Sequence, residues 1–134
     1  MDAEPSTWHV VDPFDLPDWL GEYELIWRAE SSIGGPSAPG TMCAPGERSL
    51  PLMVLGADTA FPQPVVSSSV RTSVHQAWVY SQVALLAATD SAVESYALGV
   101  PSTGMDVDLV CTALRRFAKA IGVAPDRVSA HIRL

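Results

Sequence analysis

The chain has 134 residues, the size of one domain, and 34 of them are Val, Leu, Ile or Phe, which is enough for a hydrophobic core and excludes wholesale disorder. Its formal net charge is −7, and the excess of acid lies in residues 1–67, where ten acidic and two basic residues give −8. Such a chain repels phosphate backbones, and its one basic cluster (Arg115, Arg116 and Lys119) is too small for a nucleic-acid interface, so we expect no nucleic-acid partner.

The amino-terminal quarter of the chain divides into a tail and the start of a domain. Residues 1–13 are acidic and contain proline, so we expect a tail there and a single domain over residues 14–134. Residues 15–21 predict one helical turn, because Pro17 presets helical backbone and a glycine follows. Residues 23–30 alternate apolar and polar side chains, which predicts a strand with one buried face.

A Gly/Pro-rich segment separates this strand from the next apolar run. Residues 31–49 hold four Gly and three Pro, a composition that predicts a flexible loop. Residues 50–57 form a continuous apolar run, which predicts a buried strand with Pro51 at an edge or bulge. A helix is then expected to begin near Ser67 to Ser69, because apolar side chains recur at helical spacing as far as Ser81.

The second half of the chain carries the clearest patterns. Two apolar runs flank Asp90-Ser91 and predict a β-hairpin. Asp106 is placed to cap an amphipathic helix that Gly122 ends. Residues 127–134 alternate cleanly and predict a final strand. These elements predict an α+β fold, a two-layer sandwich in which two helices cover one face of a mainly antiparallel sheet of about five strands.

The compartment that we expect depends on whether the sequence carries a signal peptide or a membrane span. The first residues carry neither the positive charge nor the apolar run of a signal peptide, and no apolar run approaches the roughly 18–20 residues of a membrane span. Cys43 and Cys111 lie far apart in sequence, as is usual for thiols of a reducing compartment. We therefore predict a cytoplasmic protein without membrane contact.

No spacing in the sequence fixes a chemistry. Metal-binding cysteine or histidine pairs, phosphate loops and nucleophile elbows are all missing, so we expect no metal and no cofactor. The best catalytic candidate is His75, which could meet Asp58 or Tyr80 as general base and orienting group. The structural alternative, which we favour, is a boundary histidine that packs on Trp78.

Acidic and aromatic residues near the amino terminus form a second candidate site. Trp8 has no periodic partner, so it either docks on its own domain, which we favour, or anchors a partner. Asp15, Asp18 and Trp19 would belong to the same partner-binding surface, and its charge would steer a basic protein. The alternative for this acidic stretch is an ordinary solvated face.

Several stretches carry a resemblance to known sequences: residues 12–21, the Trp-Arg-Ala-Glu segment at 27–30, and the His-Gln-Ala-Trp segment at 75–78. The chain resembles small uncharacterised proteins of actinobacteria over most of its length from Asp12. The resemblance implies a bacterial cytosolic origin and brings no activity and no site residues. Those proteins continue as a charged strand pair where this chain has its Gly/Pro-rich segment.

Two classes of function remain open, with a third less favoured. The leading hypothesis is a non-enzymatic interaction module that binds a protein partner, basic in charge, or a second copy of itself through sheet edges. The alternative is a small-molecule-binding protein or small enzyme with a pocket near His75. Mimicry of nucleic acid by the acidic surface is the third.

Overall fold

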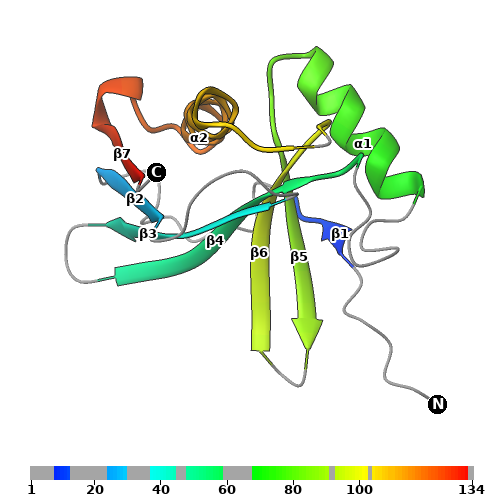
Figure 1. Ribbon diagram of the computed structural model, residues 1–134, viewed down its shortest axis with the longest axis horizontal. Helices are drawn as coiled ribbons and strands as arrows, with labels where there is room; N and C mark the ends of the chain where they lie inside the picture. The colour runs from blue at the N-terminus through cyan, green and yellow to red at the C-terminus, as the bar shows by residue number, and fades with distance from the viewer. Residues whose placement is uncertain are drawn as a thin grey trace.

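The computed structural model describes residues 8–12, 24–29, 37–44, 48–58, 68–90, 93–102 and 104–132. In these residues the chain forms one sheet with two α-helices and a short 3-10 helix (Figure 1). The strands are β1 (His9–Val10), β2 (Leu25–Ala29), β3 (Ser37–Ala44), β4 (Arg48–Gly56), β5 (Ala84–Asp90), β6 (Val93–Val100) and β7 (Val128–Ile132). The helices are α1 (Ser68–Val79), α2 (Val107–Ala120) and η3 (Pro125–Arg127).

The sheet is mixed, with the strand order β1-β5-β6-β4-β3-β2-β7. Two neighbouring pairs, β4 with β6 and β2 with β7, are parallel, and the other pairs are antiparallel. The α+β class is therefore confirmed, but a mainly antiparallel sheet of about five strands is wrong, because seven strands are present and two pairs run parallel. The connection through α2 lets β7 run in the same direction as β6 and β2, and alternation along a strand carries no information on direction.

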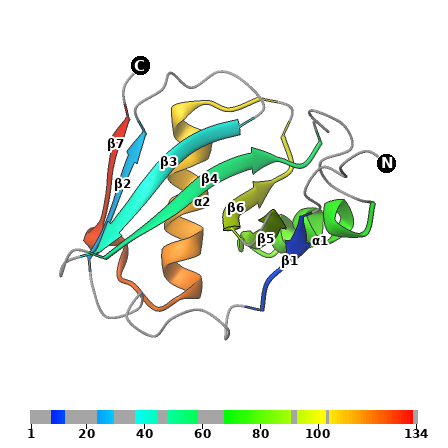
Figure 2. The same cartoon turned by 90° about the horizontal axis from the view of Figure 1, so that it is seen from below.

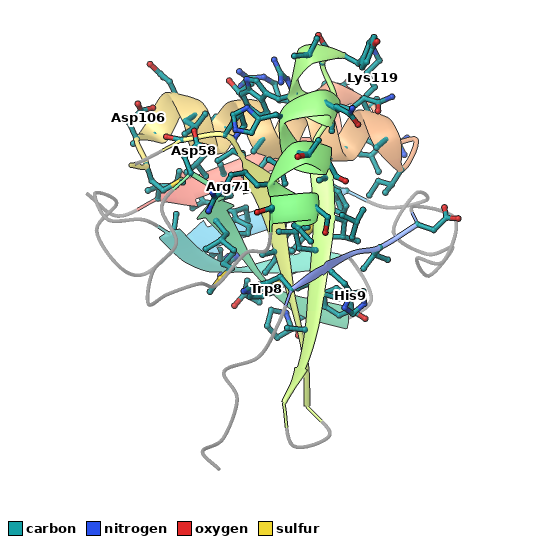
Figure 3. The ribbon with its side chains drawn as sticks, turned by 90° about the vertical axis from the view of Figure 1, so that its right-hand side faces the viewer. Trp8, His9, Asp58, Arg71, Asp106 and Lys119 are labelled. Atoms are coloured by element: carbon teal, nitrogen blue, oxygen red, sulfur yellow. The ribbon has the colours of Figure 1, made fainter. Side chains whose placement is uncertain are left out.

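The two helices pack on opposite faces of the sheet, so the expected helices on one face are also wrong. Leu85 and Leu98 belong to the apolar cluster of α2, whereas their neighbours Leu86 and Ala97 belong to the cluster of α1. In Figure 3, α1 lies in front of β5 and β6 and α2 lies behind them. Residues 83–88 are all buried, as strands covered on both faces require.

The expected loop over residues 31–49 is wrong where the structure describes it. Residues 37–44 form β3, which pairs with β4 and β2. Glycine suits this strand because a Cβ on Gly40 would lie 2.5 Å from Cζ2 of Trp27. Pro39 and Pro51 are tolerated because each lies beyond the paired residues of one neighbouring strand. Packing against the Trp27 ring thus overrides local propensity.

The remaining elements agree with the sequence analysis to within a few residues. The strand expected over 23–30 is β2, the hairpin is β5 and β6, and the last strand is β7. Asp90 pairs with Val93, so the hairpin loop lies one residue later than expected. The helical turn expected over 15–21 lies outside the described residues. Residues 8–12, expected in the tail, contribute β1 and the buried Trp8 to the fold.

Capping fixes both ends of α2. The Asp106 carboxylate accepts a hydrogen bond of 2.7 Å from the Leu109 amide, and Gly122 adopts a φ of 86° after the last turn. Both features were expected from the sequence.

We predict that Asp106→Ala lowers the free energy of unfolding by about 1 kcal/mol, because the first turn of α2 then loses its cap. Asp106→Ser is the matched control, since a serine hydroxyl can accept the same bond. Urea denaturation of the three proteins measures the effect, and equal midpoints for the alanine and serine variants would contradict it.

Candidate functional site

The structure brings His75 and Asp58 together. Asp58 follows β4 in a turn, and His75 lies on α1, seventeen positions later. Nε2 of His75 lies 2.7 Å from Oδ1 of Asp58, and the two side chains are 49% and 31% exposed. Asp58 is one of the two partners expected for His75, and both side chains of the pair are partly exposed to solvent.

The chemistry of the pair fixes which ring nitrogen carries the proton. An ionised carboxylate can only accept hydrogen bonds, so Nε2 of His75 donates to Asp58. In the neutral imidazole the other nitrogen, Nδ1, then carries the lone pair. His75 is therefore prepared to accept a hydrogen bond, or a proton, through Nδ1.

Two further contacts hold the turn that carries Asp58. Nε of Arg71 donates to the carbonyl oxygen of Ala57 at 3.0 Å, and the Ala57 amide donates to the carbonyl oxygen of Val100 at 2.7 Å. Arg71 and His75 lie four residues apart on α1, so both face the end of β4. Asp58 and Arg71 lie on the same side of the molecule in Figure 3.

The position of the pair in the sheet is as informative as its distance. β4 and β6 are neighbouring parallel strands, and they lead into α1 on one face and α2 on the other. Figure 2 shows α2 behind β3 and β4, with α1 beside β5 and β1. The connection from β4 passes over β6 to reach β5, and the connection from β6 passes over β4 toward β7 on the other face, so both leave the sheet at the same edge. Asp58 and Asp106 both follow these two ends.

The other residues singled out in the sequence lie elsewhere. Tyr80 follows the last residue of α1 and is 75% exposed, so it is not part of the His75 pair. Trp8 is buried among the α1-side cluster, which is the self-docking alternative. Asp15, Asp18 and Trp19 lie outside the described residues.

Nucleophiles and metal ligands do not gather at this edge in the part of the chain that the structure describes. The Ser102 hydroxyl donates to the Gly104 carbonyl and accepts from its amide, which is turn chemistry. Cys43 in β3 and Cys111 in α2 are half-buried and unpaired. The described residues contain no group of three potential metal ligands.

Arg71 is the contributor that the sequence analysis missed. Its only signal is the four-residue spacing to His75, which places both side chains on one helical face. The guanidinium of Arg116 lies 3.6 Å from the centre of the Trp78 ring, the ring on which we expected His75 to pack.

Comparison of the chain with known protein families, curated proteins and solved structures gave no match. Among the described residues, neither helix has the length and apolar character needed to cross a membrane. The site must therefore be interpreted from its own geometry.

Proposed function

We propose that this protein binds a small polar ligand beyond the carboxyl ends of β4 and β6, with His75 as the group that accepts a hydrogen bond from it. The observation that carries the proposal is the 2.7 Å contact between His75 and Asp58. It leaves Nδ1 as an acceptor near the carboxyl ends of two neighbouring parallel strands. The ligand therefore needs an N–H or O–H donor.

Binding is the function we assign, and proton abstraction is the chemistry that the pair could add. A histidine oriented by a carboxylate can act as general base on an acidic ligand proton. Covalent catalysis would need a nucleophile beside the imidazole, and the Ser102 hydroxyl is engaged with Gly104. We therefore place a binding protein before an enzyme.

A thermal-shift screen of small polar metabolites tests this proposal. We expect at least one compound to raise the unfolding temperature of the wild type, and we expect His75→Ala and Asp58→Asn to lose that response. His131→Ala is the matched control, since His131 is an exposed histidine on β7. Retention of the full response in His75→Ala would show that the ligand does not bind through His75.

A protein-interaction function is the second candidate, and the charge of the amino-terminal half favours it. Residues 1–67 carry −8, which would steer a basic partner. Charge reversal at Asp15 and Asp18 should then release a partner captured at low salt, and indifference to both changes would remove that surface. The resemblance to actinobacterial proteins carries no activity, so it does not choose between the candidates.

We further propose a cytoplasmic location and self-association through a sheet edge. The unpaired thiols of Cys43 and Cys111 support a reducing compartment. Among the described strands, β7 pairs with β2 alone, which leaves an edge to which a second copy could add a strand. Sedimentation at several concentrations separates a monomer from a dimer.

A further inference from the structure

A groove of about 200 Å³ lies where the carboxyl ends of α1 and α2 meet, and it shares no residue with the His75 site. It is lined by Tyr80, Ser81, Gln82, Arg116, Lys119 and Ala120. Lys119 lies beside the carboxyl end of α1 in Figure 3. The groove thus combines residues of the turn that follows α1 with residues of the last turns of α2.

Two apolar side chains at the end of α1 are unusually exposed, and one of them, Tyr80, lines the groove. Val79 and Tyr80 are 77% and 75% exposed, the highest values among the exposed large apolar residues that the structure describes. Neither side chain belongs to the core clusters. Tyrosine and arginine are enriched among the residues that contribute most of the binding energy in protein interfaces, and here both line one groove.

The groove is cationic in a chain of net charge −7. Arg116 stacks on the Trp78 ring at 3.6 Å, and its Nη1 donates to the Trp78 carbonyl oxygen at 3.2 Å. These contacts fix the guanidinium, and within the described residues they engage one of its five N–H donors. No residue that lines the groove is acidic, and within the described part Lys119 has no ion-pair partner.

The turn that ends α1 contains Ser81, whose backbone conformation is unfavourable for a residue other than glycine. The Ser81 amide donates to the carbonyl oxygen of Trp78, and the Gln82 amide donates to the carbonyl oxygen of Ala77. The turn that ends α2 has the same pair of hydrogen bonds, and Gly122 stands there at the position of Ser81. Ser81 has a φ of 60°, a conformation that glycine adopts without strain. Strained backbone of this kind persists most often at binding sites, and here the residue lines the groove.

We propose that this groove, with Val79 and Tyr80 beside it, docks an acidic segment of a partner protein. A volume of about 200 Å³ is below the roughly 300–1,000 Å³ of small-molecule pockets, so it suits one carboxylate side chain. Arg116 and Lys119 complement that carboxylate, and Val79 and Tyr80 complement an apolar residue next to it. Two cations are too few for nucleic acid on a chain of this net charge.

Fluorescence anisotropy with a labelled peptide, Glu-Asp-Leu-Phe-Glu-Asp, tests the proposal on the whole chain. We expect the peptide to bind and its Gln/Asn counterpart to fail. Lys119→Glu and Tyr80→Ser should each weaken binding about tenfold, by charge reversal and by loss of the aromatic contact respectively. Neither side chain is buried, so both variants should remain folded.

Arg115→Glu is the matched control for Lys119→Glu. Arg115 is exposed on the same helix and lies outside the groove, so its reversal changes the net charge equally and should leave binding within about twofold. Binding that is absent, equal for both peptides, or equally weakened by the two reversals would overturn the proposal. Displacement by inorganic phosphate or by an oligonucleotide at lower concentrations than by unlabelled peptide would also overturn it. His75→Ala should bind the peptide as the wild type does.

Discussion

Trp8→Ala is expected to lower the free energy of unfolding by about 3–5 kcal/mol, the range for deletion of a buried tryptophan side chain. The Trp8 side chain is 8% exposed and belongs to the cluster that α1 covers, together with Val74 and Leu86. Removing the ring leaves a cavity under α1 and frees β1, which pairs with β5 through two residues. Chemical denaturation followed by circular dichroism measures the change.

The neighbouring residue supplies the control for this prediction. His9 is exposed on β1, so His9→Ala should change the free energy of unfolding by no more than about 0.5 kcal/mol. Equal stabilities of Trp8→Ala and the wild type would mean that the tail does not dock on its own domain. A partner lost on Trp8→Ala without any loss of stability would assign the ring to an interface instead.

Gly40→Ala carries the second large effect, although it adds a single methyl group. The new Cβ would lie 2.5 Å from Cζ2 of Trp27 and 2.7 Å from the carbonyl oxygen of Arg28. Trp27 is fully buried and the carbonyl belongs to the paired backbone of β2, so neither can move cheaply. We expect a loss of about 2–3 kcal/mol in the free energy of unfolding, as for other overpacked cores.

Glycine substitutions elsewhere in the chain calibrate that result. A Cβ on Gly104 would meet nothing within 4 Å, so Gly104→Ala should stay within about 0.5 kcal/mol of the wild type. A Cβ on Gly99 would lie 2.8 Å from Cγ2 of the buried Val74, so Gly99→Ala should also destabilise the protein. The loss should be smaller than for Gly40→Ala, because the nearest atoms at Gly99 belong to side chains and include no backbone atom. An unchanged stability for Gly40→Ala would contradict the packing of β3 on Trp27.

Elements with strong local signals could be predicted from the sequence. The amphipathic spacing, the Asp106 cap and Gly122 together determine α2, and all three act within the helix itself. The hairpin of β5 and β6 is likewise local, since its two strands are separated by a short turn. These interactions form between near neighbours, so the pattern along the chain is sufficient.

The predictions of the fold that were wrong depend on contacts between residues far apart in the sequence. β3 is a strand because Gly40 fits against the Trp27 ring, and composition alone indicates a loop. The parallel pairs, and the helices on opposite faces, depend on how the chain crosses the sheet. One signal was present and not used: residues 83–88 are continuously apolar, as a strand buried on both faces requires.

The candidate site was partly predictable for the same reason. His75 stood out as a histidine at the border of an apolar helix face, and Asp58 and Tyr80 were named as its possible partners. The contact of His75 with Asp58 depends on α1 lying over the end of β4, which the sequence does not encode locally. Tyr80, the other possible partner, follows the end of α1 and lines the groove with Arg116.

The 2.7 Å contact requires that Nε2 of His75 donate to Asp58, so the neutral imidazole should carry its proton on Nε2, and the tautomer of His75 is the quantity to measure. Long-range ¹H–¹⁵N correlation spectra at alkaline pH, where histidine side chains are neutral, distinguish the two tautomers. We predict the Nε2–H form in the wild type. In Asp58→Asn the side-chain amide can donate, so the Nδ1–H form should gain population. Identical His75 spectra in the two proteins would contradict the account.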